Sequence, residues 1–146
     1  MKFLMRLRRD VAGNTLAIVA AAMVPLVAMI GSGVDMSRAY MVESRLQQAC
    51  DAGVLAGRKA MGSNAWSTAA SNAATEYFEV NYATDYLGSE STSFAATNPS
   101  GTTTVSGVAT TKLPTVIMQF FTVAEIDVSV TCAARYDVGN ADVTFV

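Results

Sequence analysis

The chain has 146 residues, of which 51% are hydrophobic, and it carries a net charge of −2. Residues 1–34 hold four basic groups and one acid, a sum of +3, whereas residues 35–146 hold six basic and eleven acidic groups, a sum of −5. This acidic remainder offers no basic surface for nucleic acid. The sequence has no histidine, which removes the usual general base, and it has no phosphate loop, nucleophile motif or zinc spacing. We therefore expect a non-enzymatic protein without cofactor, metal site or small-molecule substrate.

The first predicted element is an uncharged apolar helix over residues 15–34. At roughly 1.5 Å per residue it covers about 30 Å, the hydrocarbon thickness of a bilayer. Two alternatives remain open. A cleaved signal peptide has a shorter apolar core and a clearer cleavage site. A buried helix of a soluble domain, apolar on every face, would need a larger protein around it.

Basic residues on the N-terminal side of this run predict its orientation. We interpret residues 1–14 as a cytoplasmic tail, with Asn14 or Thr15 as the N-cap of the helix and the chain from Asp35 onward outside. The membrane-orienting residues are Lys2, Arg6, Arg8 and Arg9.

The helical pattern continues past the membrane span through residues 35–61 and ends at Gly62-Ser63-Asn64. Mostly small residues recur on it at three- and four-residue steps, and this stripe is the predicted helix-packing interface. The stripe packs either on the chain's own sheet or on another copy or partner subunit. Its members are Ala39, Leu46, Cys50, Gly53, Gly57 and Ala60.

A second helix is predicted from a cap at Ser63 or Asn64 through about Asn81, with Trp66 and Tyr77 as core anchors. The polar residues 85–93 that follow are predicted to form a loop.

The composition then changes to Thr, Ser and Val, which favour strands. We predict strands at 94–97, 102–112 and 125–137, with a turn at 98–101. Between the last two strands, residues 114–123 predict a short helix that packs three apolar side chains into the core. These side chains are Ile117, Phe120 and Phe121.

Two cysteines, Cys50 and Cys132, both follow the apolar run. In the predicted orientation they lie in an oxidising compartment, where disulfides persist. The alternation of residues 125–137 turns Cys132 toward the core, and Cys50 is then a reasonable partner. Two buried free thiols are the alternative.

The N-terminal third resembles the TadG-like branch of the TadE/TadG family of tight-adherence (Flp) pilus assembly systems. The resemblance covers roughly residues 8–60 and depends on the order of its motifs. They are Arg9-Asp10, Gly13-Asn14, Val34-Asp35, Arg38-Ala39-Tyr40, Leu46-Gln47, Ala49-Cys50-Asp51-Ala52 and Leu55-Ala56.

The resemblance implies a bacterial inner-membrane protein with a periplasmic part and a role in pilus biogenesis or adherence. Longer relatives carry a von Willebrand factor A-like domain, and residues 140–146 look like the first strand of such a domain, truncated. The Asp-x-Ser-x-Ser metal motif that should follow is absent. Pilins differ, because they are cut after a glycine and have a glutamate five residues into the mature chain, where this sequence has Ile18 after Gly13.

We therefore predict an α+β protein of pilin-like architecture, in which a transmembrane helix continues into a periplasmic helix packed on a small, mostly antiparallel sheet. Residues 35–139 form the periplasmic domain. The expected function is that of a membrane-anchored component of a pilus assembly or adherence apparatus. Its expected partners are the inner membrane and other assembly subunits or further copies of itself. The alternative is a minor pilin-like filament subunit processed at its N-terminus.

Overall fold

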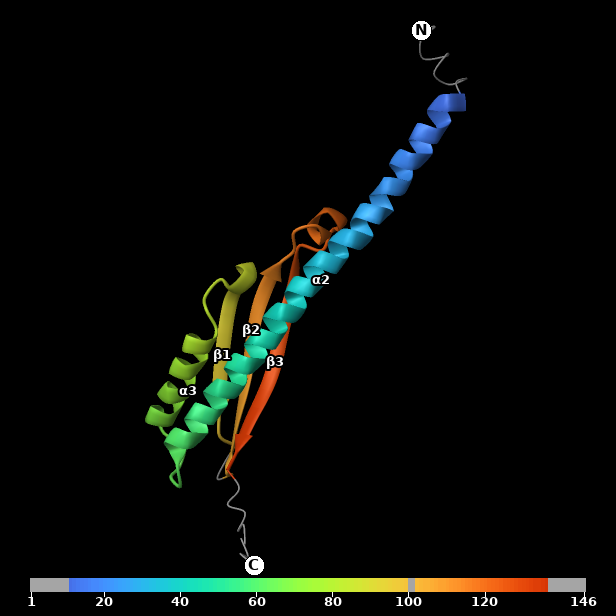
Figure 1. Ribbon diagram of the computed structural model, residues 1–146. Helices are drawn as coiled ribbons and strands as arrows, with labels where there is room; N and C mark the ends of the chain where they lie inside the picture. Colours follow the sequence, from blue (N-terminus) through green and yellow to red (C-terminus); the bar gives the residue numbers. More distant parts are fainter. Residues whose placement is uncertain (1–10, 100–101, 137–146) are drawn as a thin grey trace, which may run out of the picture. The chain divides into compact units, whose positions relative to one another are not determined.

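The computed structural model describes residues 11–99 and 102–136, and the chain divides into two units. Unit 1 contains the described residues up to Ser37 together with Thr115–Ala124. Unit 2 contains Arg38–Pro114 and the described residues from Glu125 onward. A long helix, a second helix and a three-stranded antiparallel sheet make up these units, so the predicted α+β class is confirmed (Figure 1).

Helix α2 (Val11–Met61) is one continuous element of 51 residues that contributes to both units and passes through Pro25. The predicted continuation of the apolar helix beyond Asp35 is therefore confirmed. The predicted cap at Asn14 or Thr15 is wrong, because the backbone is already helical from Val11.

Helix α2 ends where the sequence predicts. Gly62 follows Met61 in the left-handed conformation with φ of 58°, which a glycine adopts without steric strain. The backbone N–H of Gly62 donates to the carbonyl oxygen of Arg58 at 3.3 Å.

Helix α3 (Thr68–Asn81) begins later than predicted, because the residue that caps it is Ser67 and not Ser63 or Asn64. Ser67 has an extended backbone, and its Oγ accepts a hydrogen bond from the N–H of Ala70 at 3.3 Å. Trp66 consequently precedes the helix, where it packs half-buried against the core. The prediction of Tyr77 as a core anchor is wrong, since 56% of this residue is exposed.

The strands β1 (Glu90–Thr97), β2 (Thr104–Pro114) and β3 (Glu125–Arg135) form an antiparallel sheet in the order β1-β2-β3. Strand β1 starts before the predicted 94–97, after the short 3-10 helix η1 (Tyr86–Gly88). A register shift between Glu90 and Ser93 admits this polar stretch to the sheet.

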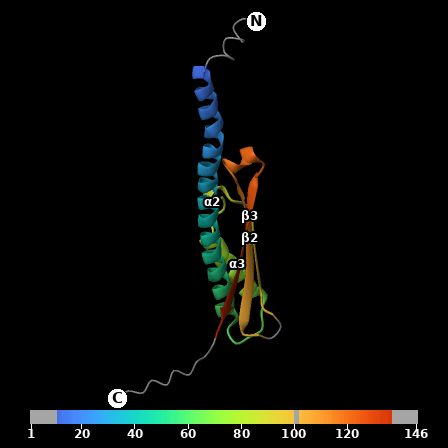
Figure 2. The ribbon, with the colours of Figure 1, turned by 90° about the vertical axis from the view of Figure 1, so that its right-hand side faces the viewer.

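Both helices cover the same face of the sheet in unit 2, where the α2 residues from Arg38 onward take part (Figure 1; Figure 2). Alternate residues of β2 and β3 are buried beneath them, as a sheet with one solvated face requires. The largest fully buried apolar side chains of this core are Leu46, Leu113, Val42, Val54 and Val105.

Glycines allow the helices and the sheet to approach closely. A Cβ atom added to Gly53 of α2 would lie 2.8 Å from Cζ of Phe94 and 2.9 Å from the carbonyl oxygen of Ala74. A Cβ added to Gly107 of β2 would lie 2.6 Å from Cγ1 of Val54. Since Ala74 contributes a backbone atom, helix α3 itself would have to move to admit a side chain at Gly53.

The substitution Gly53→Ala is expected to lower the free energy of unfolding by about 1–2 kcal/mol, because overpacking outweighs the gain in helix propensity. Denaturant unfolding of the full chain in detergent, followed by the fluorescence of Trp66, the sole tryptophan, measures the change. Gly33→Ala is the matched control, since no atom lies within 4 Å of its added Cβ. Equal unfolding midpoints for the two variants would contradict the close packing at Gly53.

Candidate interaction surfaces

The N-terminal half of α2 is an apolar segment with almost no buried side chains. In the part of the chain that the structure describes, one helix, over Thr15–Met61, contains a window long and apolar enough to cross a membrane. Only 6% of that window is buried, whereas the core helix of a soluble domain would be mostly buried. The exposed large side chains before Asp35 are Leu16, Ile18, Val19, Met23, Val24, Leu26, Val27, Met29, Ile30 and Val34.

Asp35, directly after this apolar run, is a buried carboxylate that accepts three backbone hydrogen bonds. It is 1% exposed, and its Oδ1 accepts the backbone N–H of Val116 at 2.9 Å. Its Oδ2 accepts the N–H groups of Ile117 at 2.9 Å and Met118 at 2.8 Å. Asp35 therefore fixes the backbone of a loop that is 81 to 83 residues away in the sequence.

This loop, residues 115–124, connects β2 to β3 and belongs to unit 1. Its ends are joined by the buried Thr115, whose N–H donates to the carbonyl oxygen of Ala124 at 3.0 Å. It contains the 3-10 helix η2 (Met118–Phe121), so a short helical turn is present in the predicted segment. The predicted burial of Phe120 and Phe121 is wrong, because both are exposed, while Ile117 is half-buried.

Ile117 packs on α2 within unit 1. A Cβ atom added to Gly31 would lie 2.1 Å from Cγ2 of Ile117, so the side chain of Ile117 occupies the space that Gly31 leaves. Sequence reasoning placed Asp35 at the end of the apolar run and in the motif Val34-Asp35, but it missed the hydrogen bonds from the carboxylate to the loop. No local signal could have revealed them, since the partner backbone is distant in sequence.

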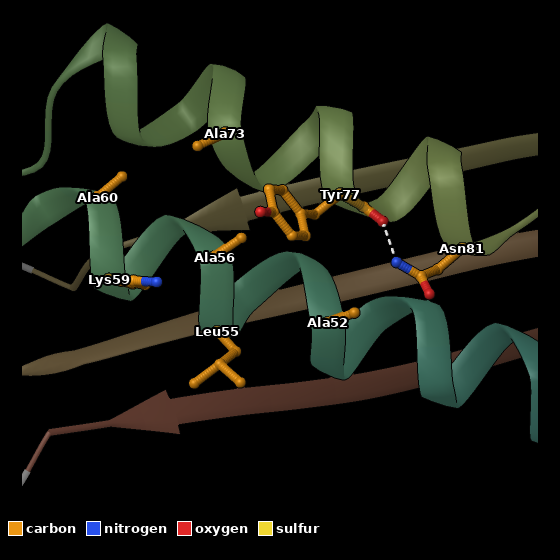
Figure 3. A pocket seen from close by; sticks show the side chains of 8 residues that line it. All are labelled: Ala52, Leu55, Ala56, Lys59, Ala60, Ala73, Tyr77 and Asn81. Carbon is orange, nitrogen blue, oxygen red and sulfur yellow. Dashed lines mark hydrogen bonds between the residues drawn. The ribbon is translucent and has the colours of Figure 1, made fainter.

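An apolar groove of about 680 Å³ lies between α2 and α3 in unit 2 (Figure 3). Tyr77 of α3 reaches toward Ala56 of α2, and the Nδ2 of Asn81 donates to the carbonyl oxygen of Tyr77 at 2.8 Å. Four of the lining residues are alanines, whose short side chains leave the groove open, and Lys59 supplies its one cationic group. The lining residues are Ala52, Leu55, Ala56, Lys59, Ala60, Ala73, Tyr77 and Asn81.

The predicted stripe of small residues divides between the core and this groove. Ala39, Leu46, Cys50, Gly53 and Gly57 are buried in the core, and both glycines lie directly against helix α3. Ala60 is exposed and lines the groove. Of the predicted stripe, Ala60 alone is therefore available to a partner.

Cys50 of α2 and Cys132 of β3 form a disulfide, with a Cα–Cα distance of 5.8 Å. Both are buried, and Gly107 lies opposite Cys132 in the register of β2 and β3. A Cβ atom added to Gly107 would lie 2.9 Å from the Sγ of Cys132, so this glycine makes room for the bridge. The disulfide joins the helical layer to the last described strand.

The carboxylates at the start of β3 belong to an exposed ion-pair network. The Nζ of Lys112 donates to Oε1 of Glu125 and lies 3.7 Å from Oδ1 of Asp127. The hydrogen bond and charge of Glu125, followed by the charge of Asp127, raise the pKa of Lys112 above its ordinary value. Among residues 11–99 and 102–136, no three His, Cys, Asp or Glu side chains group closely enough to hold a metal ion.

Two sets of predicted residues fall outside the described part of the chain. The orienting residues of the N-terminal tail belong to the first set, and residues 140–146 form the second. The tail residues are Lys2, Arg6, Arg8 and Arg9.

Together these features define a class of protein, in which a single apolar helix continues into a disulfide-bridged α+β unit. The family described as "Putative Flp pilus-assembly TadE/G-like" matches residues 13–74, which span the apolar run, the rest of α2 and the first part of α3. This segment is therefore a TadE/G-like region, and the resemblance seen in its motifs is confirmed. No curated protein and no solved structure matches the chain. The family match supports involvement in pilus assembly.

Proposed function

We propose that the protein is a non-enzymatic, membrane-anchored component of a Tad/Flp-type pilus assembly or adherence apparatus. Residues 15–34 of α2 cross the bacterial inner membrane once, and the α+β part binds other assembly subunits in the periplasm. One observation carries the proposal. The TadE/G-like region contains an exposed apolar helix, and the same chain continues into a folded unit that is closed by a disulfide.

Charge and redox chemistry support the orientation. The basic residues lie before the apolar run, and lysine and arginine are enriched on the cytoplasmic side of membrane spans. The Cys50–Cys132 disulfide lies after the run, and disulfides persist in the periplasm but not in the cytosol. Both observations support an N-terminus in the cytoplasm.

The α2–α3 groove is the surface that we assign to a second assembly subunit. Its walls are mainly alanine, and small side chains let a partner helix approach closely. Tyr77 at its edge has a large, half-exposed ring, the kind of anchor that is enriched at protein interfaces. A partner helix with small and apolar side chains fits this surface.

Photo-crosslinking from the groove tests the proposal in cells that produce the apparatus. A benzoylphenylalanine introduced at Tyr77 is expected to form an adduct with another pilus-assembly subunit, identified by mass spectrometry. The same group at Val80, which is 79% exposed on the same helix but does not line the groove, is the matched control.

The further substitution Ala56→Arg, which fills the groove with charge, is expected to reduce the Tyr77 adduct and the number of surface pili together. An adduct with a second copy of the chain would show self-association in place of a partner subunit. Equal labelling from Tyr77 and Val80, or unchanged pili in the Ala56→Arg variant, would contradict the assignment of the groove.

A further inference from the structure

The loop of residues 115–124 is an uncharged, largely apolar surface of unit 1. Between Lys112 and Glu125 the sequence contains no charged residue. Phe120 is 80% exposed, and such a concentration of exposed large side chains on one short segment marks an interaction surface. The exposed large hydrophobic residues of the loop are Val116, Phe120, Phe121 and Val123.

Two attachments hold this loop at the end of the apolar run of α2. Ile117 packs on Gly31, which is inside the run, and the N–H groups of Val116, Ile117 and Met118 bind Asp35, the first residue after it. At about 1.5 Å per residue, Gly31 and Asp35 are roughly 6 Å apart along the helix. With residues 15–34 across the membrane, as proposed above, the loop lies at the level where the helix passes from hydrocarbon to headgroups.

Most backbone N–H groups of the loop have partners within the protein. Seven of the ten bind Asp35, the carbonyl oxygen of Ala124, or carbonyl oxygens of Ile117, Met118 and Gln119. Non-helical backbone is tolerated near hydrocarbon only when such groups are satisfied by the protein. The N–H groups with these partners belong to residues 115–118, 120, 122 and 123.

We propose that residues 115–124 lie in the interfacial layer of the bilayer, with Val116, Phe120 and Phe121 in contact with lipid. The loop is then a second membrane contact of the protein, held at its depth by Asp35 and Gly31. This inference rests on the proposed function, which places residues 15–34 across the membrane. A lipid surface is the occupant because Ile117 of the loop packs on Gly31 inside the apolar run, and the loop carries no charge for a polar partner.

The depth of a tryptophan placed at Phe120 tests the inference. The full chain with Phe120→Trp is reconstituted in phosphatidylcholine vesicles that contain lipid brominated either near the headgroup end or near the methyl end of the acyl chain. Trp66 stays in place, and the spectrum of the parent protein, in which it is the sole tryptophan, is subtracted. The expected result is a blue-shifted emission at position 120 that is quenched more by bromine near the headgroup end.

Two matched variants accompany this measurement. Met23→Trp, within the apolar run, reports whether α2 spans the bilayer, and bromine near the methyl end is expected to quench it most. Val80→Trp matches the exposure of Phe120 but lies between the charged Glu79 and the polar Asn81, and it is expected to show no quenching.

The outcomes separate the inference from the proposed function. Quenching at position 23 without quenching at position 120 would leave the anchor in place and overturn the loop's contact with lipid. A blue shift at position 120 without bromine quenching would overturn it as well, because a second copy or a partner protein would then cover the patch. Absence of quenching at both positions would overturn the membrane anchor and the loop's contact together.

Discussion

Replacing both Cys50 and Cys132 by alanine is expected to lower the free energy of unfolding by about 4 kcal/mol. The two residues are separated by 82 positions, and the bridge removes the entropy of that loop from the unfolded chain. Urea unfolding of the full chain in detergent, followed by the fluorescence of Trp66, measures the change. Trp66 is suited to this because it packs against the core of unit 2 beside Gly57.

Reduction of the parent protein supplies the control for the double variant. Because reduction opens the same loop without removing a side chain, its unfolding midpoint should fall nearly as far. A loss of stability below about 1 kcal/mol in both cases would show that helix–sheet packing alone holds unit 2 together. A large loss only in the double variant would assign the effect to the deleted sulfur atoms.

Replacing Asp35 by alanine is expected to open the loop of residues 115–124 while unit 2 stays folded. Hydrogen bonds to a charged group contribute about 1.5–3 kcal/mol each, and water will replace part of what is lost. We expect a net loss of about 3 kcal/mol in local stability, which corresponds to amide exchange faster by roughly a hundredfold at Val116, Ile117 and Met118. Hydrogen exchange read by mass spectrometry or NMR on the detergent-solubilised protein measures it.

Two comparisons define the result for Asp35. Asp35→Asn keeps one carbonyl acceptor, so its exchange rates should fall between those of the parent and the alanine variant. Glu43→Ala removes an exposed acid from the same helix and should leave the loop protected. Unchanged protection in Asp35→Ala would show that packing of Ile117 on Gly31 holds the loop without the carboxylate.

The sequence predicts best those elements whose pattern is long or strictly periodic. The uncharged run and its proline-free continuation predict α2 to its last residue, and Gly62 marks its end. The alternation from Ile126 to Cys132 predicts β3 and the face of its cysteine, which leads to the disulfide with Cys50. Each of these predictions depends on local sequence preferences that agree with the tertiary structure.

The sequence predicts less well where tertiary contacts decide. Ser63, Asn64 and Ser67 all have side chains that can cap a helix, and only the path of the chain after Gly62 selects Ser67. Tyr77 has a large aromatic side chain of the kind that often packs in a core, yet its position on α3 places it at the edge of a groove. Phe120 and Phe121 likewise have side chains typical of a core, but both are exposed on the loop.

The distance in sequence between the two cysteines has a consequence for biogenesis. At a synthesis rate of roughly 5–20 residues per second, the 82 residues from Cys50 to Cys132 take about 4–16 s to make. During that interval Cys50 of α2 has no Cys132 with which to form its disulfide. The bridge therefore cannot form until nearly all of the described chain has been made, and factors that protect the unpaired Cys50 until then will influence the yield of the oxidised protein.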